Sequence, residues 1–193
     1  MKTLMHEKGG LMGKFLINQI ALSLFGFMMS ATALVMGHSW LLPLGLFGLL
    51  FYYFILFTFI HEDGLKDAIR IDGGRMKRDP LLSLKYCGIA AVPGFLIALL
   101  NAILRLSGAT GKAIEATYSI LDTITRFLTY GMYNALDNYF FTNGSDTDFY
   151  RAFFSSSGLS FVCYTFLTLA VCVFAYNLGL KKITIGNTEK NKK

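Results

Sequence analysis

Residues 41–60 read LLPLGLFGLLFYYFILFTFI, a run of twenty residues without a charged side chain. A helix of about 20 apolar residues is long enough to cross the hydrocarbon core of a bilayer. Residues 15–37, 86–106 and 159–180 are similar stretches, in which the only charged residue is Arg105. The sequence therefore predicts an all-α integral membrane protein built as a four-helix bundle.

The composition supports the same class of protein. Charged residues make up only 16% of the chain, whereas soluble domains contain about 25%. The net charge of +6 is compatible with nucleic-acid binding, but a multi-pass protein also gathers Lys and Arg in its loops to orient itself. We therefore expect a single polytopic membrane domain over residues 1–193, with the lipid bilayer and not nucleic acid as its partner.

The eighteen basic residues are distributed unevenly between the expected spans. Three precede residue 15, six lie in the loop 61–85 and five lie in the tail 181–193, which makes fourteen on one side. The other four are spread between residues 105 and 158. The positive-inside rule then predicts that both termini and the first loop are cytoplasmic and that residues 107–158 are extracytoplasmic. The basic tail is expected to be disordered.

An additional amphipathic helix is predicted between the third and fourth spans. Asp122 and Arg126 form an i,i+4 pair on its polar face, and Gly131 is a point where the helix is expected to break. The helix is expected either to lie along the membrane interface or to cap the bundle. Apolar residues recur at helical spacing on its other face: Ile114, Tyr118, Leu121, Leu128, Met132, Ala135 and Tyr139.

Three of the expected spans carry a stripe of small or polar residues at steps of three and four. Such stripes allow close approach of another helix in lipid. They predict helix packing, either within the bundle or with a membrane-protein partner or a second copy of the chain. The stripe residues are Gln19, Ser23, Gly26, Ser30, Ala33 and Gly37 in the first span, Ala90, Gly94, Ala98 and Ala102 in the third, and Thr168, Cys172, Ala175 and Gly179 in the fourth.

No cofactor or metal site is predicted. His6, His38 and His61 are not linked by metal-ligand spacing, and the chain lacks CxxC pairs, phosphate loops and nucleophile motifs. The cysteines are predicted to be packing residues. No ionisable residue lies in the middle of an expected span, which argues against a proton-coupled carrier that works alone.

Three functional hypotheses follow from these patterns. The first is a non-enzymatic subunit or accessory protein of a membrane complex, for example of a transporter. The second is a lipid-modifying enzyme that uses the cytoplasmic acidic residues Glu62, Asp63 and Asp67. The third is a small channel or carrier formed by several copies of the chain.

Overall fold

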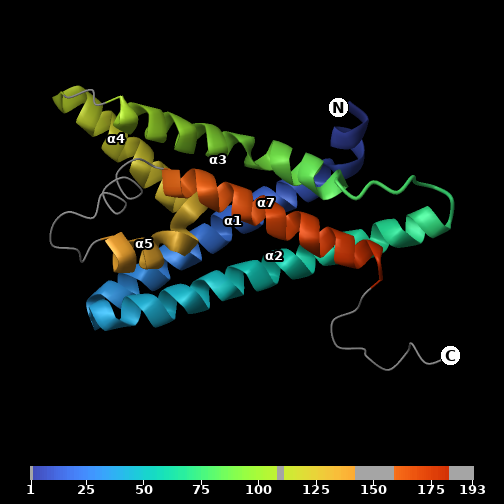
Figure 1. The fold of residues 1–193 in the computed structure, drawn as a ribbon, viewed down its shortest axis with the longest axis horizontal. Helices are drawn as coiled ribbons and strands as arrows, with labels where there is room; N and C mark the ends of the chain where they lie inside the picture. Colours follow the sequence, from blue (N-terminus) through green and yellow to red (C-terminus); the bar gives the residue numbers. More distant parts are fainter. Residues whose placement is uncertain (1, 108–110, 142–158, 183–193) are drawn as a thin grey trace.

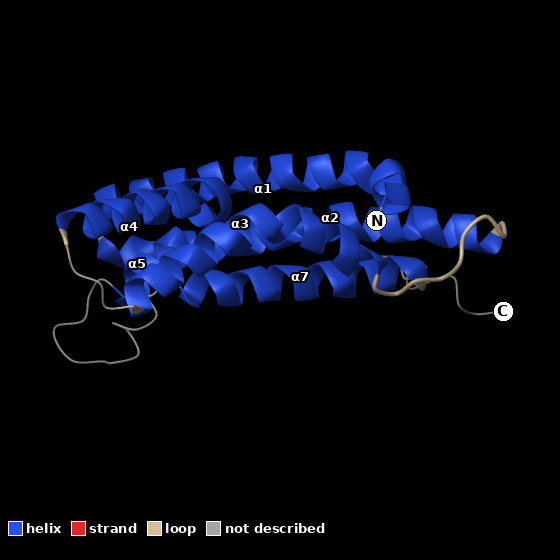
Figure 2. Ribbon diagram, turned by 90° about the horizontal axis from the view of Figure 1, so that it is seen from above, coloured by secondary structure: helices blue, strands red, loops and turns tan. Residues whose placement is uncertain are grey.

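The computed structural model describes residues 2–107, 111–141 and 159–182, which contain helices and turns but no strand. Four long helices lie side by side: α1 (Lys2–Met36), α2 (Leu41–Asp72), α3 (Leu82–Leu106) and α7 (Leu159–Leu180) (Figures 1 and 2). All four are long and apolar enough to span a membrane. The predicted all-α four-helix bundle is therefore confirmed.

The two ends of the bundle differ. α1 begins and α7 ends at the same end, which we call the termini end (Figure 1). The short 3-10 helix η1 (His38–Trp40) joins α1 to α2 at the other end, which we call the turn end. Gly37 makes this tight turn with a φ of 110°, a conformation that favours glycine, and the Trp40 amide donates a hydrogen bond to the Gly37 carbonyl at 2.9 Å.

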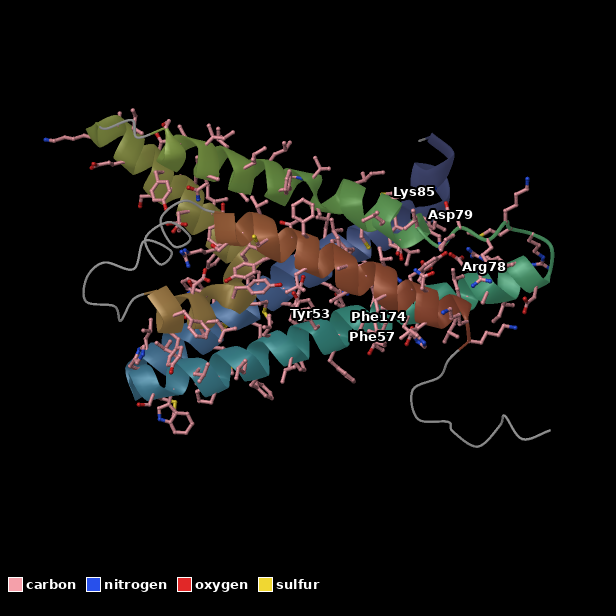
Figure 3. All side chains as sticks on the ribbon, in the orientation of Figure 1. Tyr53, Phe57, Arg78, Asp79, Lys85 and Phe174 are labelled. Atoms are coloured by element: carbon pink, nitrogen blue, oxygen red, sulfur yellow. The ribbon has the colours of Figure 1, made fainter. Side chains whose placement is uncertain are left out.

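Helix α2 continues well beyond the apolar stretch that predicted it. The segment 61–72 was expected to belong to a charged loop, but it is helical to Asp72. The reason is that one face of this segment packs on α7: a Cβ atom on Gly64 would lie 2.5 Å from the Tyr176 carbonyl oxygen. Phe57 and Phe174 extend the α2–α7 contact toward the bundle centre, with ring centroids 6.4 Å apart (Figure 3). The described connection between α2 and α3 is therefore only residues 73–81.

The segment between the third and fourth spans consists of several short helices. It comprises α4 (Lys112–Thr125), a π-helical turn η2 (Arg126–Tyr130), a 3-10 turn η3 (Gly131–Tyr133) and α5 (Asn134–Phe141). We call residues 112–141 the inserted segment, because α4 runs from the turn end toward the bundle centre and α5 returns (Figure 1). The additional helix is thus present, and a 3-10 turn begins at the predicted break.

The tip of the inserted segment is buried against the middle of α1. The Gly131 amide donates a hydrogen bond to Ser23 Oγ at 2.7 Å, and a Cβ atom on Gly26 would lie 2.5 Å from Met132 Cα. A position on the membrane surface or as a cap was expected. The small residues of α1 instead leave room for the chain to enter the bundle, where irregular backbone can find partners. Residues 142–158 and the basic tail from 183 onward lie outside the described residues.

Candidate functional site

A largely buried arginine, with 20% of its side chain exposed, lies at the start of the irregular turn. Arg126 Nε donates a hydrogen bond to Asp122 Oδ2 at 2.8 Å, and Arg126 Nη1 donates to Asn134 Oδ1 at 3.0 Å. Nη1 also lies 3.4 Å from Asp137 Oδ2, and the Tyr164 hydroxyl donates to the other Asp137 oxygen at 2.6 Å. We call these five residues the arginine cluster. It joins α4, η2, α5 and α7, with only 5% of the Asp137 side chain exposed.

Two serines of α1 hold the inserted segment in place. Ser23 Oγ donates to the Arg126 carbonyl at 3.1 Å while it accepts the Gly131 amide. Ser30 Oγ accepts hydrogen bonds from Asn134 Nδ2 at 3.0 Å and from Asn138 Nδ2 at 3.3 Å. The bonds of Ser23 supply partners for backbone groups at the irregular turns, and those of Ser30 supply partners for two side-chain amides. The polar members of the α1 stripe therefore position the arginine cluster.

A series of hydroxyl groups continues from the arginine cluster toward the middle of the bundle. The Tyr164 ring stacks on Tyr133 at 3.8 Å between centroids. The Tyr133 hydroxyl is hydrogen-bonded to that of Tyr53, which lies midway along α2 (Figure 3), and is 3.4 Å from Thr168 Oγ1. Tyr52 adjoins this group through its ring, whose centroid lies 5.1 Å from that of the Tyr53 ring. We call these five residues the tyrosine column.

Two thiols lie between the tyrosine column and the termini end. Cys87 of α3 and Cys172 of α7 are both free and have no exposed surface, and their side chains lie close to each other. The third cysteine, Cys163, is exposed near the beginning of α7. The prediction that the cysteines pack in the core is met by the first two only, and their pairing across α3 and α7 was not anticipated.

A buried lysine lies at the termini end between two aspartates. Lys8 Nζ lies 2.9 and 3.0 Å from the two Asp63 oxygens and 2.7 Å from Asp67 Oδ2. The hydroxyls of Tyr86 and Tyr176 donate to Asp63 and Asp67 at 3.0 and 2.8 Å. We call these five residues the lysine cluster. Lys8 is only 2% exposed, so the charges depend on one another for solvation.

The lysine cluster leaves little capacity for a metal ion. Asp67 accepts a further ion pair from Arg70 at 3.2 Å, while Glu62 is exposed on another face of α2. The structure brings Asp63 and Asp67 together but does not add Glu62 to them. Within the described ranges, no group of three or more His, Cys, Asp or Glu residues could hold a metal ion. Of the acidic residues named for a lipid-modifying enzyme, Asp63 and Asp67 thus serve as partners of Lys8, and Glu62 does not.

Weaker ion pairs lie at the surface of the termini end. Lys182 pairs with Asp72, which links the end of α7 to the end of α2. Lys85 pairs with Asp79 at the start of α3 (Figure 3), and this hydrogen bond is the main cause of a lowered pKa of the Asp79 carboxyl. These exposed pairs contribute little to stability, and we assign them no part in the site.

The stripes of small residues are largely occupied by contacts within the chain. Gln19 and Gly37 are half-buried, and the other twelve stripe residues are buried. The α1 stripe faces the inserted segment, and a Cβ atom on Gly179 of the α7 stripe would collide with the α2 backbone at His61. Of the two alternatives, packing within the bundle therefore accounts for most of the stripe residues.

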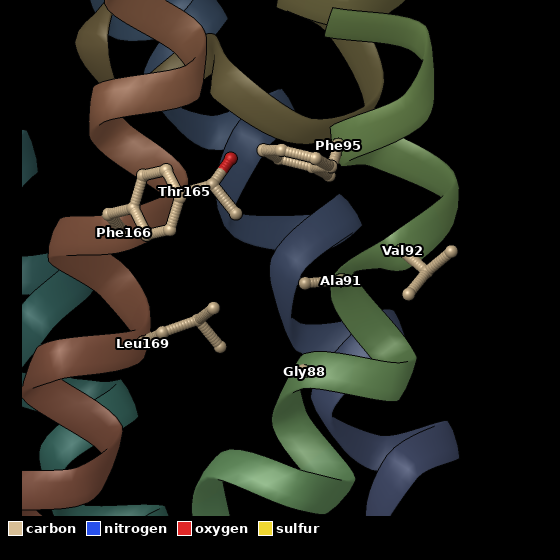
Figure 4. A pocket seen from close by; sticks show the side chains of 7 residues that line it. All are labelled: Gly88, Ala91, Val92, Phe95, Thr165, Phe166 and Leu169. Atoms are coloured by element: carbon tan, nitrogen blue, oxygen red, sulfur yellow. The ribbon is translucent and has the colours of Figure 1, made fainter. Parts of the chain in front are cut away.

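An apolar cavity of about 160 Å³ lies between α3 and α7 (Figure 4). Its lining carries one hydroxyl group and no charge, so it lacks the polar groups that would orient a ligand. We therefore assign it no chemistry. The lining residues are Gly88, Ala91, Val92, Phe95, Thr165, Phe166 and Leu169.

Sequence reasoning missed the two charged clusters. It placed Lys8, Asp63 and Asp67 in polar segments outside the membrane, and it placed Arg126 on a solvated helix face. A partial signal was present, because Asp63 and Asp67 are four residues apart on the face that also carries Gly64 and Ala68. Tyr52 and Tyr53 gave no separate signal, because aromatic residues are common between Phe47 and Phe59.

Comparisons with known proteins give this site no precedent. No protein-family model, no curated protein and no solved structure matches the chain. The function must therefore be argued from the geometry of the two clusters and the column between them.

Proposed function

We propose that this chain is a non-enzymatic membrane transport protein, working alone or as a subunit of a larger complex, and that it moves protons along its buried polar groups. The observation that carries the proposal is the placement of Arg126 and Asp137 inside the bundle by the inserted segment. Ionisable residues are costly inside a membrane and mark ion or proton pathways. The earlier argument against a proton-coupled carrier rested on the absence of such residues from the expected spans.

The interrupted helices of the inserted segment also support a transport protein. In many transporters the binding site is built from helices that are interrupted near the middle of the membrane. Here η2 and η3 interrupt the helical segment next to the middle of α1. Asp137 is suited to exchange protons, because it accepts a hydrogen bond from Tyr164 and can take up or release a proton at its carboxyl group.

The remaining polar groups offer steps toward the other end. The tyrosine column begins at Tyr164, and the paired thiols of Cys87 and Cys172 follow it. Tyr86 then donates to Asp63 in the lysine cluster. A chain of groups that each donate and accept hydrogen bonds can relay protons when side chains or water close its gaps.

We also place both termini in the cytoplasm. The basic residues of the α2–α3 connection and the exposed lysines that follow α7 lie at the termini end, and the positive-inside rule assigns that end to the cytoplasm. A reporter enzyme that is active only outside the cytoplasm should be active when fused at Thr142. A reporter that is inactive at Thr142 but active at the C-terminus would show the opposite orientation.

The proposal is tested by proton flux into liposomes that contain the purified protein and a pH-sensitive dye. A potassium gradient with valinomycin drives proton entry, and we expect uptake above that of empty liposomes. Asp137→Asn should reduce the rate at least tenfold, because the amide keeps polar contacts with Arg126 and Tyr164 but cannot exchange a proton. Tyr133→Phe should reduce it as well.

Matched controls separate transport from packing. Asp72→Asn and Tyr139→Phe lie outside the column and the clusters, so both should keep the rate of the unmodified protein. All variants must elute as the folded protein in size-exclusion chromatography. Equal rates in Asp137→Asn and the unmodified protein would refute the pathway. A rate that appears only when a co-purifying partner is present would assign the chain as a subunit.

A further inference from the structure

A second polar site lies beside the lysine cluster, between the first turns of α1 and the last turns of α2. A cavity of about 280 Å³ is lined there by both charged and small residues. Four of them are basic and one is acidic, so the lining carries a positive excess. The lining residues are Lys8, Gly10, Leu11, Lys14, Asp63, Lys66 and Arg70.

Two of the four basic residues are not neutralised. Lys8 is held between Asp63 and Asp67, and Arg70 pairs with Asp67. Lys14 and Lys66 are exposed and form no ion pair with any described residue. They come from different helices and line the same cavity. An anion placed between them would therefore meet two ammonium groups whose charge is not already compensated.

The level of the cavity along the bundle indicates the kind of anion. The uncharged run of α1 begins at Phe15, immediately after Lys14, and that of α2 ends at Ile60, immediately before the turns that line the cavity. Lys14 and Lys66 therefore lie where the polar headgroups of a bilayer begin. Basic pockets at this level, between transmembrane helices, bind phosphate-bearing headgroups.

We propose that this cavity binds a phosphate group, supplied by an anionic phospholipid of the leaflet at the termini end. Lys14 and Lys66 contact the phosphate oxygens, Leu11 contacts the glyceryl carbons, and Lys8 forms the floor while Asp63 and Asp67 retain it. Gly10 borders open space at the cavity, since a Cβ atom there would have no other atom within 4 Å. This site shares Lys8 and Asp63 with the lysine cluster at the end of the proposed pathway, but phosphate binding does not require proton transport.

The test is calorimetric titration of the purified full-length chain in neutral detergent. One arm adds dioctanoyl phosphatidic acid, a second adds dioctanoyl phosphatidylcholine, and a third adds inorganic phosphate. We expect phosphatidic acid to bind and phosphatidylcholine not to bind. Binding of inorganic phosphate that competes with phosphatidic acid would support the same cavity with a soluble ligand. Failure of both anions to bind would overturn the proposal.

Two pairs of variants locate the binding. Each basic residue near an anionic surface contributes about fivefold to affinity, so Lys14→Gln with Lys66→Gln should weaken binding of phosphatidic acid by about 25-fold. The control, Lys77→Gln with Lys112→Gln, removes the same charge from exposed positions elsewhere and should not change binding. Equal weakening in both pairs would show only a general charge effect and would overturn the site.

A steric pair tests the cavity without a change of charge. Gly10→Phe should fill the cavity and weaken binding at least tenfold. Gly9→Phe makes the same change at the neighbouring position, which also has open space but does not line the cavity, and it should bind as the unmodified protein does. Unchanged affinity in Gly10→Phe would contradict the assignment.

Discussion

The ammonium group of Lys8 lies 2.7 Å from the Asp67 carboxylate, and the side chains of the two residues are 3% and 0% exposed. Lys8 is at the beginning of the first span and Asp67 is in the last turns of α2. The pair therefore ties the start of α1 to an extension of α2 that apolar composition alone does not predict. The first prediction concerns what this pair contributes to stability.

Replacing Lys8 by Met should lower the free energy of unfolding by about 3–5 kcal/mol, because the carboxylates of Asp63 and Asp67 would stay buried without their cation. Unfolding in a titration of sodium dodecyl sulfate measures the change. Lys14→Met is the matched control, since Lys14 is exposed and its replacement should change stability by no more than about 0.5 kcal/mol. Equal stability of Lys8→Met and the control would mean that Lys8 is not buried in this pair.

A second prediction concerns the close approach of the inserted segment to α1. Gly26→Ala should destabilise the bundle by about 1–3 kcal/mol, because its methyl group would overlap the Met132 backbone. Gly48→Ala is the control, because a Cβ atom there has no other atom within 4 Å. It should be neutral or stabilise by up to about 1 kcal/mol through helix propensity. The same denaturant titration compares the two variants. A Gly26→Ala variant more stable than Gly48→Ala would contradict the contact between the inserted segment and α1.

A third prediction concerns a buried amide on α3. The Asn101 side chain has no exposed surface, and neither its oxygen nor its nitrogen has a hydrogen-bond partner. Asn101→Leu should therefore raise the free energy of unfolding by about 1–3 kcal/mol, because it removes the desolvation cost of two unpaired polar atoms. A loss of stability in this variant would show that Asn101 has a partner, such as a bound water.

A fourth prediction concerns the thiols. In the folded protein only Cys163 should react with a maleimide reagent, because Cys87 and Cys172 are fully buried. After denaturation all three should react. Mass spectrometry of the labelled peptides counts and locates the modifications. Rapid labelling of Cys172 in the folded protein would contradict the packing of α7 against α2 and α3.

The four long helices were predictable from the sequence because a helix able to cross a membrane requires a long apolar stretch, such as residues 41–60. The extension of α2 was not, because composition makes residues 61–72 resemble a solvated loop. Asp63 and Asp67 become compatible with burial only when Lys8, some fifty-five residues earlier, is placed beside them. Pairings across such distances leave no local pattern.

The inserted segment was also predictable only in part. Its amphipathic spacing and its break at Gly131 were visible in the sequence, and Asp122 and Arg126 were recognisable as a pair. The partners that draw this segment inward are Ser23 and Ser30, which were interpreted only as small packing residues. The sequence alone does not tell whether a serine packs against a neighbouring helix or accepts a hydrogen bond from a segment inserted into the bundle.

The insertion of this segment into the bundle is the claim on which the proposed pathway depends. It is tested most directly by cross-linking Ser30→Cys to Asn138→Cys with a short bifunctional methanethiosulfonate reagent, in protein that carries Cys163→Ser. The two side chains are 3.3 Å apart at Oγ and Nδ2, so we predict a cross-linked peptide pair in mass spectrometry. The control pair, Ser30→Cys with Ser119→Cys on the exposed face of α4, should give none. Cross-linking of the control pair alone, or of neither pair, would contradict the insertion.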